Sequence, residues 1–213
     1  MGCKIYFIRH GQSLGNLSGT FLGHTDLDLS PLGYMQAKRT AVYLADIHID
    51  KVYSSDLLRA YNTCGEYLKI CDIKPIISPK LREIYAGDWE NTPFDVLQSK
   101  FKNTYNTWIN DIGNSCPDNG ESVKSLTERI VGYITDISNE NDDKTVAVFT
   151  HATVIRAFFN FAYGNTVDQM KELRWATNAS VSSVTFENGR FTVDEYGTDS
   201  FLNDLKTGFP VNV

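Results

Sequence analysis

Side chains able to do chemistry follow several short apolar segments that we predict to be β-strands. The first segment, CKIYFIRH, ends in Arg9 and His10, and Gly11 comes next. A later segment, KTVAVFTH, ends in His151, so two of the four histidines stand at the ends of predicted strands. Imidazole is a competent nucleophile near neutral pH, and arginine holds anions through paired hydrogen bonds. These residue types together indicate nucleophilic attack on a bound anion.

Two further predicted strands are followed by residues of the same kind. DKVYSS leads into Asp56 and, one helical turn later, Arg59, while Arg82 and Glu83 come after KPIIS. In an open α/β sheet, ligands bind beyond the carboxyl ends of the parallel strands. If these strands are parallel neighbours, Arg59 and Glu83 join the two histidines at one edge of the sheet.

Each of these residues alone has a plainer explanation. A histidine at a strand end more often caps the strand or packs in the core, and a lone Arg59 is more often a solvated cation. A lone Glu83 is most often the ion-pair partner of Arg82 or of another base. Together, these explanations require four independent coincidences on one edge of one sheet. We therefore favour the functional interpretation, in which imidazoles, guanidinium groups and a carboxyl carry out phosphoryl transfer without a metal.

The segments between the predicted strands have helical patterns. Ser30 and Pro31 provide an N-cap and a first-turn proline. Apolar residues then recur at helical spacing in residues 57–68 and 121–137, and residues 152–162 follow the fourth strand directly. Alternating strands and helices predict an α/β fold, a three-layer sandwich in which helices cover both faces of a mostly parallel central sheet.

The C-terminal part has a different pattern. Two alternating segments, ASVSSVTF and FTVDEY, lie on either side of Asn188-Gly189, a strong signal for a tight turn. We therefore expect an antiparallel hairpin at the edge of the sheet. Residues 91–120 contain several aromatic residues and predict a helical insertion over the active site. No linker or repeat interrupts the chain, so residues 1–213 are expected to form a single domain.

The motifs around the candidate residues also occur in a known order. The run RHGQS (9–13), with Asn16 three residues later, resembles the R-H-G-[EQ]-[ST]-x-x-N signature of the histidine phosphatase superfamily, the phosphoglycerate-mutase-like proteins. The resemblance continues through SSDLLRAYNT (54–63), LREIYAGDWE (81–90) and HATVIR (151–156). It follows the family's order over residues 4–186, which is most of the chain.

This resemblance implies a role for each matching position. His10 would be the phosphorylated nucleophile, Glu83 the proton donor, and Gly11 would let backbone N–H groups approach the anion. The implied catalytic set is His10, Glu83, His151, Arg9 and Arg59. The implied substrate- and phosphate-binding set is Arg9, Gly11, Asn16, Gly23, Arg59, His151 and Ala152.

Two positions depart from the family's usual pattern. Glycine commonly follows the second histidine and the Trp-Glu pair, whereas this chain has Ala152 and Asn91 there. A methyl group at position 152 would narrow the pocket or remove a permitted positive φ. Asn91 affects the loop near the proton donor. Neither substitution removes a catalytic atom.

Three functions stay open at this stage. A phosphomonoesterase would let water hydrolyse the phosphohistidine, whereas a cofactor-dependent phosphoglycerate mutase would return the phosphoryl group to a bisphosphate and needs extra cations. Residues 91–122 contain two lysines and no arginine, which favours the phosphatase. A non-catalytic phosphate-binding module is the third alternative, but it would need neither a nucleophile nor a proton donor.

Composition limits the partners. The net charge of −6 disfavours nucleic acid and anionic membranes, and no segment approaches the roughly 20 apolar residues of a membrane span. No histidine or cysteine cluster has the spacing of a metal site, and the four cysteines lack a C-x-x-C motif, which suits a reducing compartment. We therefore expect a cytoplasmic protein without a cofactor. Its partners would be a small phosphorylated metabolite and inorganic phosphate, with a monomer and a homodimer both left open.

Overall fold

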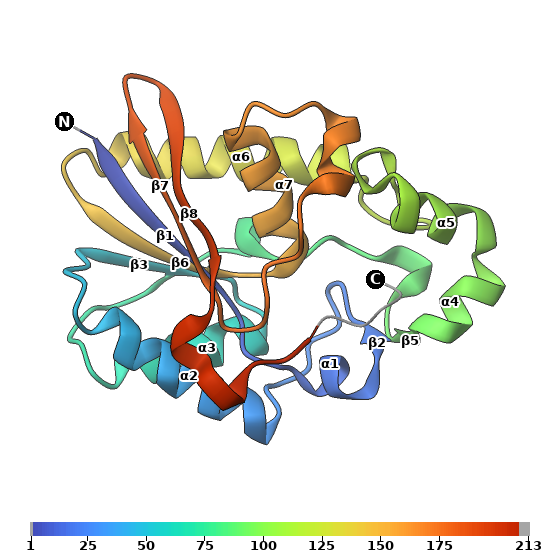
Figure 1. The fold of residues 1–213 in the computed structure, drawn as a ribbon, viewed down its shortest axis with the longest axis horizontal. Helices are drawn as coiled ribbons and strands as arrows, with labels where there is room; N and C mark the ends of the chain where they lie inside the picture. The colour runs from blue at the N-terminus through green and yellow to red at the C-terminus, as the bar shows by residue number, and fades with distance from the viewer. Residues whose placement is uncertain (1, 209–213) are drawn as a thin grey trace.

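A six-stranded sheet forms the centre of the computed structural model, which describes residues 2–208 (Figure 1). The strand order is β4-β3-β6-β1-β7-β8. The strands are β1 (Cys3–Arg9), β3 (Lys51–Ser54), β4 (Ile76–Ile77), β6 (Thr145–Thr150), β7 (Val181–Glu187) and β8 (Arg190–Thr198). The first four pair in parallel, whereas β7 runs antiparallel to both β1 and β8. The predicted mostly parallel sheet with an antiparallel C-terminal edge is confirmed.

Helices cover both faces of this sheet. On one face lie α2 (Pro31–Leu44) and α3 (Leu58–Leu68), and on the other lie α6 (Val123–Glu140) and α7 (Ala152–Ala162) (Figure 1). Each face has its own buried apolar cluster: Ile8 packs with the α2–α3 side, whereas Ile5 and Phe7 pack with the α6–α7 side. The predicted three-layer arrangement is therefore confirmed.

Local sequence signals explain where these elements begin and turn. The Ser30 side chain accepts a hydrogen bond from the Gly33 N–H and caps α2, with Pro31 in its first turn. Asn188 and Gly189 have φ angles of +52° and +75°, and they connect β7 to β8 by the tight turn that the sequence predicts.

Residues 91–120 form short elements beside the sheet rather than part of it. The strand β5 (Thr92–Pro93) pairs antiparallel with β2 (Thr20–Phe21), which follows the short helix α1 (Leu14–Ser18). The segment then forms α4 (Phe94–Lys100) and α5 (Lys102–Asn110). Five 3₁₀ helices complete the described part of the chain: η1 (Pro79–Leu81), η2 (Gly87–Trp89), η3 (Ile112–Asn114), η4 (Val167–Glu172) and η5 (Ser200–Leu205).

Aromatic packing joins this segment to the N-terminal loop. Phe21 makes edge-to-face contacts with Trp89, Phe94 and Trp108, at ring-centroid distances of 5.6, 6.1 and 5.2 Å. Trp89 and Trp108 are themselves buried. The insertion is thus anchored to the loop that follows β1, which also carries the candidate site residues.

Candidate active site

The carboxyl ends of the parallel strands β1, β3 and β6 meet at one edge of the sheet. Arg9, the last residue of β1, is paired in register with Thr150, the last residue of β6. A histidine follows each of them, and the ring centroids of His10 and His151 lie 5.2 Å apart. The parallel register is therefore what brings these two histidines together.

The surroundings of His10 favour its neutral imidazole. Its Nδ1 lies 2.7 Å from the carbonyl oxygen of Gly11. Since a carbonyl can only accept, Nδ1 carries the hydrogen and Nε2 keeps a lone pair. Burial, followed by the charges of Arg59 and Arg9, holds the pKa of His10 well below its usual 6.5. His10 therefore has the protonation state of a nitrogen nucleophile at neutral pH.

His151 is fully buried and is hydrogen-bonded by a serine that follows β3. Its Nε2 lies 2.9 Å from Ser55 Oγ, and that oxygen also accepts from the Leu57 N–H. Among residues 2–208, the acceptor for the Ser55 hydroxyl is Nε2 of His151. Because Nε2 accepts this hydrogen bond, it carries no hydrogen, and the imidazole hydrogen is on Nδ1. That Nδ1 is buried and has no hydrogen-bond partner among the described residues. Burial, then Arg59, holds the pKa of His151 well below 6.5.

Two buried arginines stand beside the histidines. Arg9 donates from Nη1 to the Ala176 carbonyl at 2.7 Å. Arg59 donates to the carbonyls of Gly23 and Thr25, at 2.7 and 2.9 Å. Burial lowers the pKa of each guanidinium to about 10, which leaves both charged at neutral pH. Because a guanidinium has five N–H donors, the two carbonyls fix Arg59 and leave it donors for an anion.

Glu83 is not the ion-pair partner of its neighbour. Arg82 instead binds Asp56 through hydrogen bonds of 2.8 and 2.6 Å. The Glu83 carboxylate accepts from the Ile84 N–H at 2.9 Å and from the Thr153 N–H, in the first turn of α7, at 3.2 Å. These backbone bonds hold Glu83 at the same sheet edge as His10 and leave oxygen lone pairs for other partners.

Most of these groups line one hollow of about 70 Å³. The residues that line it are Arg9, His10, Ser13, Asn16, Thr20, Phe21, Leu22, Gly23, Arg59, Glu83, Phe94, Trp108, Ala152, Thr153 and Trp175. His151 is not among them, because it lies fully buried next to the His10 ring. Two guanidinium groups and the N-terminus of α7 give the hollow a positive character, against a single carboxylate. The arrangement can therefore bind an anion beside a nucleophile and a carboxyl.

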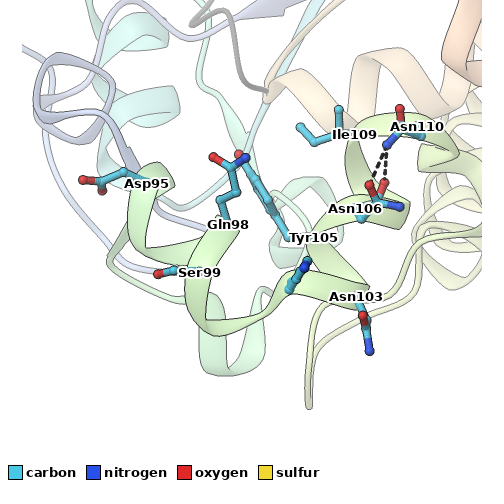
Figure 2. A pocket seen from close by; sticks show the side chains of 9 residues that line it. Asp95, Gln98, Ser99, Asn103, Tyr105, Asn106, Ile109 and Asn110 are labelled. Carbon is cyan, nitrogen blue, oxygen red and sulfur yellow. Dashed lines mark hydrogen bonds between the residues drawn. The ribbon is translucent and has the colours of Figure 1, made fainter.

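A second, wider hollow of about 890 Å³ lies on α4 and α5 (Figure 2). Its lining contains neither histidine nor arginine, and the Asn110 amide is occupied by hydrogen bonds to Asn106. Figure 2 shows the side chains that line it: Asp95, Gln98, Ser99, Asn103, Tyr105, Asn106, Ile109 and Asn110, with Lys102. The smaller hollow therefore holds the reactive groups, although the wider one has the larger volume.

Gly11 has a packing role in this structure. Its N–H donates to Thr63 Oγ1 at 3.0 Å, so it is engaged within the protein rather than directed to an anion. A Cβ at this position would collide with the carbonyl oxygen of Gly33, at the start of α2. The absence of a side chain therefore allows close packing beneath His10, whose Nδ1 uses the Gly11 carbonyl.

Asn16 and Gly23 line the hollow but also hold the loop after β1. The Asn16 side-chain oxygen accepts from the Ser13 N–H and from the Asn178 amide, each at 3.1 Å. Gly23 has a φ of +52°, and a Cβ there would collide with the Glu90 carboxylate. Both residues therefore fix the loop whose carbonyls orient Arg59.

The two departures from the expected glycines have different consequences. Ala152 is the first residue of α7 and does not have a positive φ, so its methyl group lines the hollow without backbone strain. Asn91 has a φ of +53°, in the left-handed region that asparagine adopts more readily than most residues. At Ala152 the methyl group therefore narrows the hollow, and the loss of a permitted positive φ does not apply.

Two further residues at the site carry no clear local signal. Trp175 lines the hollow from the loop between η4 and β7. Glu90, from the Trp-Glu pair, accepts hydrogen bonds from the backbone N–H groups of residues 24, 25 and 86. Glu90 belongs to the run LREIYAGDWE that carries the family resemblance, whereas Trp175 is found only through its place in the fold.

Within residues 2–208, no three histidine, cysteine, aspartate or glutamate side chains are grouped so that they could hold a metal ion. None of the helices described for this chain is both long enough and apolar enough to cross a membrane.

Comparison with known proteins agrees with this geometry. A family model described as "Histidine phosphatase superfamily (branch 1)" matches residues 5–199. The chain is 30% identical over 188 residues to phosphoserine phosphatase 1 of Hydrogenobacter thermophilus, covering 88% of each protein. It is also 30% identical over 152 residues to adenosylcobalamin/alpha-ribazole phosphatase of Salmonella typhimurium, which covers 71% of this chain and 75% of that relative.

Solved structures share the fold. Bacillus stearothermophilus YhfR superposes with a TM-score of 0.90 at 23% identity, over 94% of this chain and 100% of that one. A mycobacterial glucosyl-3-phosphoglycerate phosphatase gives a TM-score of 0.85 at 23% identity, over 92% of this chain and 99% of that one.

The buried histidines predict a specific loss of stability in acid. Below about pH 6.5 the unfolded chain binds a proton at each histidine, whereas folded His10 and His151, with their lowered pKa values, do not. Stability should therefore fall as the pH drops from 6.5 towards the folded-state pKa, by ~1.4 kcal/mol per pH unit for each histidine. The free energy of unfolding can be measured with urea at several pH values in this range. Its slope against pH should be shallower for His10→Asn than for wild type. His48→Asn, at a side chain that is 86% exposed, should keep the wild-type slope.

A second prediction concerns the tautomer of His151. Ser55→Ala removes the hydroxyl that donates to Nε2, so ¹⁵N spectra of the imidazole should show a loss of the Nδ1–H form. Ser55→Thr keeps a hydroxyl and should restore that form. Ser54→Ala, at the neighbouring buried serine whose hydroxyl donates to the Ser55 carbonyl, is the matched control. An unchanged His151 spectrum in Ser55→Ala would contradict the assignment.

Proposed function

Because the chain belongs to the histidine phosphatase superfamily, we propose that it is a metal-independent phosphomonoesterase that acts on a small phosphorylated metabolite through a phosphohistidine at His10. The observation that carries the proposal is a neutral imidazole with a lone pair on Nε2, in one hollow with two guanidinium groups and a carboxyl. Several similar proteins are named as phosphatases, which supports the same reaction class.

The phosphate group of the substrate would bind between the two arginines. Arg9 and Arg59 stay charged at working pH and present planar donors that match phosphate oxygens. The first turn of α7, which includes Thr153, adds backbone N–H groups and a favourable dipole. The resemblance also implies a phosphate contact for His151, whose Nδ1 has no hydrogen-bond partner among the described residues but does not line the hollow.

In the first step, His10 Nε2 would attack phosphorus as the bond to the alcohol oxygen breaks. Glu83 would give its proton to that oxygen, so that a neutral alcohol leaves. The Gly11 carbonyl would hold the Nδ1–H as the ring gains positive charge. In the second step, Glu83 would take a proton from water, the water oxygen would bond to phosphorus, and the P–N bond would break to release phosphate and neutral His10.

The mutase and binding-module alternatives receive less support. A mutase must hold a second anionic group of its bisphosphate, which requires cations beyond the phosphate pocket. Lys100 lies over the Phe101 ring at 4.9 Å, and Lys102 lines the wider hollow of Figure 2 instead. A non-catalytic module would need neither His10 nor Glu83 at the hollow.

The nucleophile assignment predicts a covalent intermediate. The protein is mixed with a ³²P-phosphomonoester that it turns over rapidly, and the reaction is quenched in base. Acid-labile, base-stable label should then be found on the wild-type protein and none on His10→Asn. Asparagine can still donate to the Gly11 carbonyl, so we expect the variant to fold. His48→Asn should be labelled like wild type. Equal labelling of His10→Asn and wild type would refute the assignment.

The proton-donor assignment predicts a dependence on the leaving group. An alkoxide needs a proton to leave, whereas p-nitrophenolate leaves largely without one. Glu83→Gln should therefore slow phosphoryl transfer from an alkyl phosphate by about 10²–10⁴-fold, the usual range for general acid catalysis. The loss on p-nitrophenyl phosphate should be much smaller in single-turnover measurements, which isolate the first step.

An ion-pair role for Glu83 would give a different result. In that case both substrates would lose the same factor, together with thermal stability. Asp56→Asn is the matched control, because it breaks the observed ion pair with Arg82 at the same sheet edge. It should affect both substrates alike.

A further inference from the structure

Beyond the reactive groups, the hollow is walled by connected aromatic rings. We call Phe21, Phe94, Trp108 and Trp175 the aromatic wall; all four line the hollow. Trp108 stacks on Trp175 at 6.2 Å between ring centroids, and Phe21 contacts Trp108 and Phe94 edge-to-face. Leu22 adds a further apolar surface. A group bound past the phosphate position would therefore meet apolar carbon on several sides.

The charged groups of the hollow are all committed to the reaction. Among the described residues that line it, they are Arg9, Arg59 and Glu83, in addition to His10. One cation lies against the aromatic wall, Arg156, whose guanidinium is 4.3 Å from the Trp175 ring centroid. It donates to the carbonyls of residues 170 and 171 and does not line the hollow. A second anionic group on the substrate would therefore lose its hydration without gaining a counter-charge.

We propose that this site selects phosphomonoesters of neutral, largely apolar alcohols and discriminates against esters whose leaving group carries a carboxylate or a second phosphate. The inference rests on the proposed phosphatase function and adds the substrate class. Apolar leaving groups gain by contact with the aromatic wall, in proportion to the apolar area that is removed from water. Anionic ones are rejected because they would be desolvated and unpaired.

The test compares two esters that differ by one carboxylate group. They are 2-phenylethyl phosphate and 2-(4-carboxyphenyl)ethyl phosphate, whose leaving alcohols have closely similar reactivity. We expect kcat/KM for the carboxylate ester to be lower by at least about tenfold. Equal values, or a preference for the carboxylate ester, would overturn the substrate class. Hydrolysis of p-nitrophenyl phosphate but of neither ester would overturn it too.

A failure of the proposed function would look different. If no phosphate is released from either ester, from p-nitrophenyl phosphate or from O-phosphoserine, then the phosphatase assignment itself is wrong. A protein that hydrolyses O-phosphoserine at least as well as 2-phenylethyl phosphate remains a phosphatase, but it contradicts the proposed selectivity.

A positive charge introduced into the aromatic wall should weaken the preference for the neutral ester. Phe94→Lys, at a half-buried position of α4, places a cation beside the leaving group. It should raise the ratio of kcat/KM for the carboxylate ester over the neutral ester by about tenfold or more. The matched control is Gln98→Lys, which adds the same charge to the same helix on the side of the wider hollow (Figure 2). Equal shifts of this ratio in the two variants would show that the added charge acts through a long-range field and not by contact at the aromatic wall. That result would contradict the proposal.

Discussion

The burial of two guanidinium groups against two imidazoles is the constraint on which the site depends. Desolvation is the largest influence on all four groups, and the positive charge of Arg59 acts on both histidines. A proton on either ring would add a third buried cation, so the imidazoles stay neutral. The same charges thus attract an anion and keep His10, the proposed nucleophile, unprotonated. Without a bound anion, this concentration of positive charge is unfavourable, and the surrounding structure must offset it.

Backbone carbonyls and the nearby charge of Glu83 provide part of that compensation. Arg59 is held by the carbonyls of Gly23 and Thr25 in the loop that follows β2. Glu90 fixes this loop as well, because its carboxylate accepts the N–H groups of residues 24 and 25 at 2.6 and 2.7 Å. The absence of a Cβ at Gly23 makes room for that carboxylate. A chain of contacts therefore links Glu90 to Arg59, one of the proposed phosphate-binding residues.

The sequence was sufficient to predict features that depend on local pattern and strand direction. The alternation of strands and helices predicts a parallel sheet, and parallel strands must bring residues such as His10 and His151 to one edge. The Asn188-Gly189 turn is also a local property. Residues 91–120 contain the helices α4 and α5, and their role as an insertion over the active site stays a prediction.

Side-chain partners could not be predicted in the same way, because they depend on contacts between distant residues. Glu83 is the sequence neighbour of Arg82 and was a possible ion-pair partner. Only the fold shows that Arg82 binds Asp56 instead, 26 residues away in the sequence. Glycine at position 11 suggested an anion-binding N–H, yet that N–H is occupied by Thr63, 52 residues away in the sequence. Trp175 comes from an irregular loop, where no periodicity indicates which side chain faces the hollow.

In the proposed reaction, a bound phosphate group would balance the charges of the buried guanidinium groups. A phosphomonoester dianion between Arg9 and Arg59 would compensate two positive charges that burial makes unfavourable. Transfer of the phosphoryl group to His10 would keep this dianionic group between the two arginines, while the imidazole ring became cationic with its Nδ1–H on the Gly11 carbonyl. The same two cations would therefore stabilise the bound substrate and the proposed intermediate alike, so that neither state leaves the buried charges uncompensated.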